Sequence, residues 1–372
     1  MGTWVLRVAA LVLGLGVALG GGELLLRLVG YQGQHARIHS VFDPRFGTVR
    51  RDSWVFQMTM EPPEANLRGQ RVPLDKPPGE TRVLFIGDSG TEGAFVPLEA
   101  SFPMRFEAEL AARMPERRVR AINAGVFGMT TLDELHFLPR LLALRPDVVV
   151  LGLFLSNDIN FNLGHIERRR PGSAELWPQL VDRSALAHFA HLRMLGWGAK
   201  VGERMPATAD WLPREAQLVD RDGFHMLSYP AGEVALYMRR PSPLVDRAYG
   251  VLEEALRHFV ALGEQHRFEL AVLLIPAPSA VAGRLQLLHY PDIQGELRRQ
   301  GVEVSEAQLD VHLPRMRVAS LCERLSLLCI DPTERLQEIG MGVFFPTDEH
   351  PTVTGHAALG KALSARAPEL LD

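Results

Sequence analysis

Cysteine is scarce in this chain, since only Cys322 and Cys329 occur among its 372 residues. Neither has metal-ligand spacing or histidine neighbours. We expect no metal site and no bound cofactor in this chain. An excess of charge of one sign is also missing, because 40 Lys and Arg stand against 44 Asp and Glu. This balance gives no support for nucleic acid as a partner. No internal repeat is visible, and the length suits one large α/β domain or two smaller ones.

The one long apolar run lies at the N-terminus. Residues 4–22 are nearly all Val, Leu, Ala and Gly, interrupted by Arg7. About twenty such residues at ~1.5 Å rise cover the ~30 Å hydrocarbon core of a membrane. We therefore predict a single-pass anchor and juxtamembrane helix over residues 1–30, with a periplasmic catalytic domain. A signal peptide cleaved near Ala18-Leu19-Gly20 and a buried core helix are the alternatives. The orientation stays open, because arginines after the run argue against translocation.

Residues 31–80 contain Pro62-Pro63 and Pro77-Pro78-Gly79 and show little periodicity. This composition predicts an extended lead-in packed along the next domain. From residue 81 to residue 372, segments with the periods of strands and helices alternate, which predicts an α/β domain whose parallel sheet is covered on both faces. Residues 159–242 break the alternation and are expected as an insertion at the carboxyl end of the third strand, where ligands bind in such sheets. Strands are predicted at 83–86, 119–122, 148–154, 270–275 and 327–330, and helices at 102–113, 133–143, 245–262, 318–325 and 356–365.

The motif Gly87-Asp88-Ser89 follows the first predicted strand. Gly87 ends the apolar run, and Asp88, Ser89 and Thr91 are residue types that favour a helix start. Ser89 is therefore expected on a tight turn that exposes its hydroxyl and aims backbone N–H groups at whatever the hydroxyl attacks. An ordinary turn with a helix cap is the alternative, because a nucleophilic serine also needs a base and an oxyanion site.

Three further blocks follow later predicted strands. Residues 123–131, which include Gly128, follow the second strand, and glycine lets the backbone approach a ligand and free an N–H for it. Asn157 follows the third strand and has an amide that can donate to a developing oxyanion. Asp348 and His350 follow the fifth strand and put a carboxylate and an imidazole on one loop. Each block alone suits a plain turn, but their shared place at the carboxyl ends of strands favours a catalytic site.

These blocks resemble those of the SGNH (GDSL-like) hydrolase family. Gly87-Asp88-Ser89 is similar to the nucleophile block, and Gly128, Asn157 and His350 are similar to the glycine, asparagine and histidine of the later blocks. The resemblance runs from the first strand to the C-terminus. The N-terminal apolar run and residues 66–71 also look like the lead-in of membrane-anchored bacterial members. The family implies a three-layer α/β/α flavodoxin-like fold with a five-stranded parallel sheet, and it implies hydrolysis of acyl esters.

The resemblance also implies a role for each matched residue. Ser89 attacks the carbonyl, and His350 takes its proton and later gives it to the leaving alcohol. Asp348 orients the imidazole. The oxyanion is held by the backbone N–H groups of Ser89 and Gly128 and by the amide of Asn157. The expected substrate is an O-acylated carbohydrate or lipid of the cell envelope.

The chain departs from the family's pattern at three positions. Gly90 stands where a bulkier apolar residue is usual, and Leu155 stands where many members have glycine. The usual acid lies three residues before the histidine, and that position is Thr347. Asp348 lies two residues before it, so a dyad of Ser89 and His350 is an alternative.

Two assignments near these blocks are structural. Asp88 is assigned to the turn, and His356, the second candidate base, is assigned to packing or capping inside the last helix.

Cys322 lies near a predicted helix end and Cys329 in the next strand. They form a disulfide if the domain is outside the cytoplasm, or stay as buried thiols.

Two other functions compete with the esterase. An O-acyltransferase acting on a cell-envelope glycan would use the same acyl-serine intermediate and hand it to a sugar hydroxyl. A non-catalytic glycan-binding or assembly factor with the same fold is favoured only by the altered spacing of the acid. The number of required catalytic groups favours the esterase.

Overall fold

The computed structural model describes residues 2–28, 40–43, 45, 47–50, 53–168, 186, 231–285, 297–298, 303–346 and 348–371. Most of the predicted insertion at 159–242 lies outside the described residues, and so does Thr347. The chain forms two compact units, of which the first comprises Met1–His39 and Arg170–Pro213 and the second comprises Ser40–Arg169 and Arg214–Asp372.

The first unit contains one long helix, α1 (Gly2–Leu28). Glu23 accepts hydrogen bonds from the Arg27 side chain at 2.7 Å and from the Leu186 backbone N–H at 2.9 Å. In the part of the chain that the structure describes, no helix combines the length and the apolar character needed to cross a membrane. The anchor predicted for residues 1–30 is therefore not found there.

The second unit is built on a five-stranded parallel sheet with the strand order β10-β9-β8-β6-β7. Counted along the chain this order is 2-1-3-4-5, the doubly wound flavodoxin-like arrangement. The predicted α/β fold with a parallel sheet is confirmed, and each predicted strand overlaps an observed one. The strands are β6 (Glu80–Gly87), β7 (Arg118–Asn123), β8 (Val148–Phe154), β9 (Glu269–Ile275) and β10 (Leu328–Ile330).

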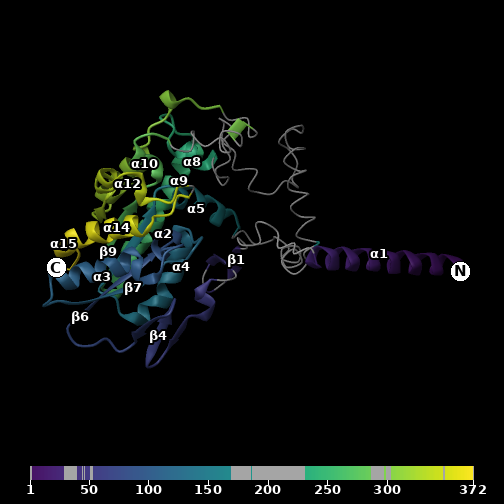
Figure 1. The fold of residues 1–372 in the computed structure, drawn as a ribbon, viewed down its shortest axis with the longest axis horizontal. Helices are drawn as coiled ribbons and strands as arrows, with labels where there is room; N and C mark the ends of the chain where they lie inside the picture. Colours follow the sequence, from purple (N-terminus) through teal and green to yellow (C-terminus); the bar gives the residue numbers. More distant parts are fainter. Residues whose placement is uncertain are drawn as a thin grey trace. The chain divides into compact units, whose positions relative to one another are not determined.

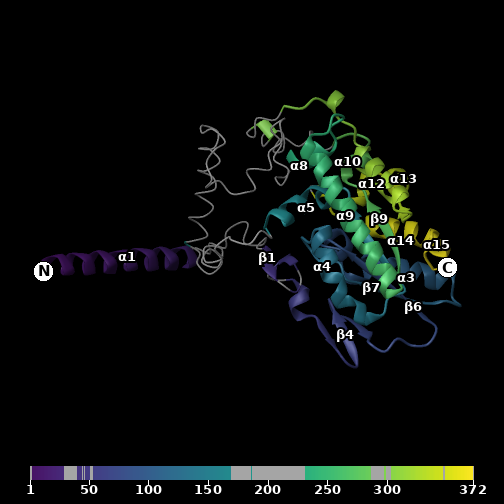
Figure 2. The ribbon, with the colours of Figure 1, turned by 180° about the vertical axis from the view of Figure 1, so that it is seen from behind.

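Successive residues of each strand face two separate apolar cores, because side chains alternate across a sheet. In β6, Val83 and Phe85 enter one core, whereas Leu84 and Ile86 enter the other. Helices cover both faces (Figures 1 and 2), and α9 runs across one of them. On the Phe85 side lie α3 (Phe102–Arg113), α13 (Thr333–Ile339) and α14 (Val353–Ala365), and on the Leu84 side lie α4 (Thr131–Leu141), α5 (Asn157–Arg168), α9 (Pro243–His266) and α12 (Leu313–Arg324).

Several helices differ from those predicted. α12 begins at Leu313 rather than at residue 318, because Pro314 in its first turn has a backbone suited to a helix start. α5 begins at Asn157, where a turn leading into the insertion was expected. α13 was not predicted, since it is too short for apolar periodicity to show. The remaining helical segments are α2 (Ser89–Glu92), α8 (Ala231–Leu236), α10 (Pro278–Ala282), α15 (Ala367–Leu371), η2 (Trp54–Gln57), η3 (Leu98–Ala100), η4 (Leu142–Leu144), η7 (Glu306–Gln308) and η8 (Met341–Val343).

The lead-in is more regular than the extended segment we expected. β1 (Ser40–Asp43) and β2 (Gly47–Arg50) pair antiparallel. A second antiparallel sheet contains β3 (Thr59–Glu61), β4 (Glu64–Leu67) and β5 (Gln70–Pro73). Arg68 and Gly69 join β4 to β5 with φ of 51° and 83°, the left-handed geometry of a two-residue hairpin turn. Inward-facing side chains of this sheet complete the Leu84-side core, namely Ala65, Leu67 and Val72.

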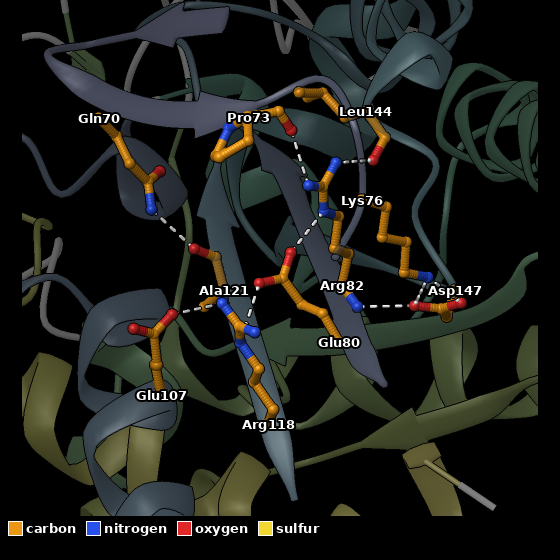
Figure 3. A network of polar contacts seen from close by, with 10 residues as sticks. All are labelled: Gln70, Pro73, Lys76, Glu80, Arg82, Glu107, Arg118, Ala121, Leu144 and Asp147. Carbon is orange, nitrogen blue, oxygen red and sulfur yellow. Dashed lines mark hydrogen bonds and ion pairs between the residues drawn. The ribbon is translucent and has the colours of Figure 1, made fainter. Parts of the chain in front are cut away.

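Polar contacts tie the lead-in to the central sheet (Figure 3). The Gln70 amide donates to the Ala121 carbonyl at 2.7 Å and accepts from the Asn123 N–H at 3.0 Å, so it pairs with the outer edge of β7. Arg82 is fully buried and donates to the carbonyls of Pro73 and Leu144 at 2.6 Å each. The lead-in from Ser40 onward is therefore part of the same packed unit as the sheet, and residues 31–39 lie outside the described residues.

Candidate active site

The nucleophile turn joins a strand to a helix as the sequence predicts, but Ser89 is buried rather than exposed, because its hydroxyl faces His350. β6 ends at Gly87 and α2 begins at Ser89, with Asp88 as its N-cap. The Asp88 carboxylate accepts the Gly90 N–H at 2.8 Å, which confirms the turn role assigned to it. A Cβ at Gly87 or at Gly152 would collide with the Thr91 side chain. Glycine at these two positions lets α2 lie directly on β6 and β8.

The structure explains two of the departures from the family's pattern. A Cβ at Gly90 would lie 3.2 Å from Asp88 Oδ1 and 3.4 Å from Ile275 Cδ1, so the site has little room for a larger residue. Leu155 is buried in the Leu84-side core, and its N–H donates to the Ile275 carbonyl at 2.9 Å. The loop before Asn157 therefore continues the pairing of β8 with β9.

Ser89, His350 and Asp348 meet although 261 positions separate the first two. Ser89 Oγ lies 2.8 Å from His350 Nε2, and His350 Nδ1 is bonded to Asp348 Oδ1. The same carboxylate oxygen accepts the His350 backbone N–H at 2.8 Å. This local turn, typical of aspartate, explains how an acid two residues before the histidine reaches the imidazole.

The charges around His350 make it a better base. Burial acts to lower its pKa, but the hydrogen bond and charge of Asp348 and the charge of Asp88 raise the pKa above its ordinary 6.5. The bond to His350 in turn lowers the pKa of Asp348. An ionised Asp348 beside a basic imidazole is the pairing that general-base catalysis needs.

His356 is kept away from this chemistry. Its Nδ1 accepts the N–H of Phe102, the first residue of α3, at 3.2 Å. Its ring stacks on Phe102, with centroids 6.0 Å apart and planes at 19°. Burial lowers its pKa to about 3. The structural role predicted for His356, packing or capping, is confirmed, and the residue does both.

Gly128 and Asn157 follow the two strands that flank β6. Val126 donates to the Gly87 carbonyl at 2.9 Å, which brings the loop carrying Gly128 to the nucleophile turn. Gly128 has a φ of 81°, where a side chain would be strained. Asn157 is the first residue of α5, and its Oδ1 is buried without a hydrogen-bond partner among the described residues. Their roles as oxyanion donors stay a prediction.

Sequence reasoning missed two residues that support this loop. Glu92, at the end of α2, accepts the Phe127 N–H at 2.6 Å and so holds the residue before Gly128. Arg68, in the hairpin between β4 and β5, reaches the end of α2 and donates to the Glu92 carbonyl. The Arg-Gly pair signals the hairpin turn, but no local pattern indicates where the arginine side chain goes.

Buried carboxyl groups lie near the nucleophile, and their burial was not predicted from the sequence. Burial, reinforced by the charges of neighbouring carboxylates, raises the pKa of Glu134 and of Asp158 well above their usual values. Burial also raises the pKa of Asp88. Both carboxyl oxygens of Glu134 are without a hydrogen-bond partner among the described residues. This environment therefore favours the neutral, protonated form of Glu134.

Aromatic rings surround the imidazole of His350. Phe127 stacks on it with centroids 5.8 Å apart and planes at 19°. Phe95 meets it edge-to-face at 5.0 Å and 87°. Phe345 and Phe127 also contact Phe95 edge-to-face, at 6.3 Å and 6.5 Å. The sequence carried no signal for this cluster, because its members come from three separate loops.

Comparison with known proteins gives distant likenesses. No family model matches the chain, and no curated protein does. Among solved structures, TesA is 14% identical, and the match covers 78% of this chain and 100% of that chain with a TM-score of 0.40. LAE5, an α/β hydrolase enzyme from the metagenome of Lake Arreo, is 15% identical over 78% and 97% of the two chains, with a TM-score of 0.40. Axe2, an acetylxylan esterase from Geobacillus stearothermophilus, is 15% identical over 78% and 94%, with a TM-score of 0.41. Such likenesses carry no weight for activity, so the function is inferred from the site's own geometry.

Proposed function

We propose that the chain is a serine ester hydrolase of the SGNH type. The observation that supports this most directly is the 2.8 Å contact between Ser89 Oγ and His350 Nε2, with Asp348 on the other ring nitrogen. A nucleophile, its base and a group that orients the base are thus joined by hydrogen bonds in the order that catalysis needs. An assembled triad argues against the non-catalytic alternative.

The geometry suits acyl transfer in two steps. Ser89 Oγ attacks the ester carbonyl while His350 Nε2 takes its proton, and the imidazolium then protonates the leaving alcohol. Water then attacks the acyl-serine carbonyl while the same imidazole takes its proton, and the imidazolium returns a proton to Ser89 Oγ as the carboxylic acid leaves. The N–H groups of Ser89 and Gly128 and the Asn157 amide are the proposed oxyanion donors. In other hydrolases one such donor contributes about 3–4 kcal/mol to the transition state.

We propose as substrate an O-acylated carbohydrate or lipid of the cell envelope. The Cys322–Cys329 disulfide supports a location outside the cytoplasm, because disulfides persist in oxidising compartments. The pairing also favours the disulfide over the buried thiols that the sequence left open.

Replacement of the nucleophile tests the activity. Ser89→Ala should lower the turnover of a short p-nitrophenyl ester by a factor of about 10³ or more. It should also abolish labelling by a fluorophosphonate probe. Ser320→Ala, on the exposed side of α12, is the matched control and should behave like the native protein. Unchanged turnover in Ser89→Ala, with circular dichroism showing an intact fold, would refute the proposal.

A further inference from the structure

We propose that Phe95 is the platform on which the alcohol part of the substrate stacks, and that this alcohol is a sugar ring. The inference rests on the proposed esterase function and names its substrate class. It begins from the conformation and exposure of one side chain.

Phe95 is held where a phenylalanine is rarely found. Its φ is 67°, in the left-handed region that bulky side chains avoid. The residue is 66% exposed, so burial does not compensate for this backbone. The preceding residue, Ala94, is fixed by its N–H, which donates to the Ser89 carbonyl at 3.0 Å. Strained backbone of this kind is concentrated at functional sites.

The ring contacts give Phe95 a defined orientation beside the base. Phe127 packs on the face of the His350 imidazole, and Phe95 stands perpendicular to both rings. Phe345 contacts Phe95 from the loop that carries His350. Phe127 is therefore placed to position the imidazole, whereas Phe95 presents its exposed ring to an incoming molecule.

The mechanism decides which part of the substrate Phe95 meets. His350 Nε2 delivers a proton to the leaving alcohol, so that alcohol must lie on the imidazole side of the ester. In the same mechanism the carbonyl oxygen of the ester faces the proposed oxyanion donors. A ring whose centroid is 5.0 Å from the imidazole centroid therefore flanks the alcohol.

The exposure of Phe95 favours a sugar over a lipid as that alcohol. An open aromatic face offers a flat apolar contact and leaves the edge of its partner in water. A pyranose has an apolar face of C–H groups and hydroxyls around its rim, so it can stack without dehydrating those hydroxyls. An alkyl chain is stabilised in proportion to the apolar area that binding removes from water. A single exposed ring buries little of that area.

The experiment holds the acyl group constant and varies the alcohol. Phe95→Ala and native protein are compared on a mono-O-acetylated methyl pyranoside, on ethyl acetate and on a long-chain alkyl acetate. We expect kcat/KM for the sugar acetate to fall about tenfold relative to that for ethyl acetate, the size of a lost aromatic contact. Phe95→Tyr, which keeps the ring, should restore the sugar preference. Met316→Ala is the control, because Met316 is an exposed apolar residue on α12, and it should leave the preference for the sugar acetate unchanged.

A second measurement separates recognition from folding. Phe95→Gly removes the left-handed strain, so its Tm should equal or exceed that of the native protein while the sugar preference is lost. Equal losses of kcat/KM in Phe95→Ala on all three acetates would overturn the proposal and leave Phe95 as a support for His350. A selective loss on the long-chain acetate would overturn it in favour of a lipid alcohol. Failure of the native protein on every ester, without probe labelling, would refute the esterase itself and is distinct from these outcomes.

Discussion

The Arg68 guanidinium lies 3.9 Å from the Glu92 carboxylate, and so it links the lead-in hairpin to the nucleophile helix. It also donates to the carbonyls of Glu92 and Gly93 at the end of α2, the second at 3.4 Å. Glu92 in turn holds the loop that carries Gly128, because its carboxylate accepts the N–H of Phe127. One arginine outside the central sheet thus supports both the helix of Ser89 and the loop of Gly128.

Arg68→Ala should therefore reduce kcat much more than it changes KM. Misplacement of catalytic groups by ~1 Å can cost about 10²-fold, and we expect a loss between about 10-fold and 100-fold. Arg68→Lys should retain only part of the native kcat, since an ammonium cannot donate the paired hydrogen bonds of a guanidinium. Arg71→Ala is the control, because Arg71 is exposed on the same hairpin and pairs with Glu64. Steady-state kinetics of all three variants check this, and equal losses in Arg71→Ala would contradict it.

The pH profile should report the pKa of His350. Only the neutral imidazole accepts the serine proton, so kcat/KM should rise with pH through a value above 6.5. Asp348→Asn removes the bond and charge that raise this pKa. Its inflection should move to lower pH, and its plateau should fall by about 10²–10⁴-fold.

The same profile decides between a triad and a dyad. Asp246→Asn, an exposed aspartate on α9 that pairs with Arg317, is the matched control and should leave the curve in place. A plateau unchanged in Asp348→Asn would mean that Ser89 and His350 work without an acid.

Glu134 should make the protein less stable as pH rises. Its folded pKa lies well above 4.5, so above that pH the unfolded state releases the proton more readily and gains stability relative to the folded state. One such group contributes a slope of up to ~1.4 kcal/mol per pH unit until the folded pKa is reached. Glu134→Gln removes this contribution, so the stability of this variant relative to the native protein should grow as the pH rises from 4.5 towards the folded pKa of Glu134.

Urea unfolding across this range measures the difference. Glu254→Gln, on the exposed side of α9, should give a difference that does not vary in this way. A constant offset for Glu134→Gln would show that Glu134 is ionised in the folded protein.

Loss of the Cys322–Cys329 disulfide should destabilise the joint between α12 and β10. The bridge closes a short loop, with a sequence separation of 7. Chain-entropy arguments for a loop of this size give about 2–3 kcal/mol. Cys322→Ala with Cys329→Ala should lower the free energy of unfolding by this amount, measured without reductant. Addition of dithiothreitol should bring the native protein to the same value, and no response to reductant would contradict the pairing.

Much of the fold follows from local pattern. The apolar runs at Val83–Ile86 and Val148–Phe154 are followed by turn-forming residues, and such patterns depend on neighbours along the chain. Parallel strands then bring their carboxyl ends to one edge, which is why Ser89 and His350 were predicted to meet. Helix ends and short helices such as α13 were less predictable, because packing can override weak local signals.

By itself, the sequence determined the order of the five parallel strands, the position of Ser89 on a strand-to-helix turn and the structural place of His356 in the last helix. Only the tertiary structure decided that Asp348 reaches the imidazole, that Arg68 supports α2 and that Phe95 stands exposed beside the base. These relations join loops far apart in the chain, and each depends on where a side chain lies once the sheet and its two cores have formed. Periodicity along a chain carries no information about such contacts, because they arise from the packing of whole elements against one another.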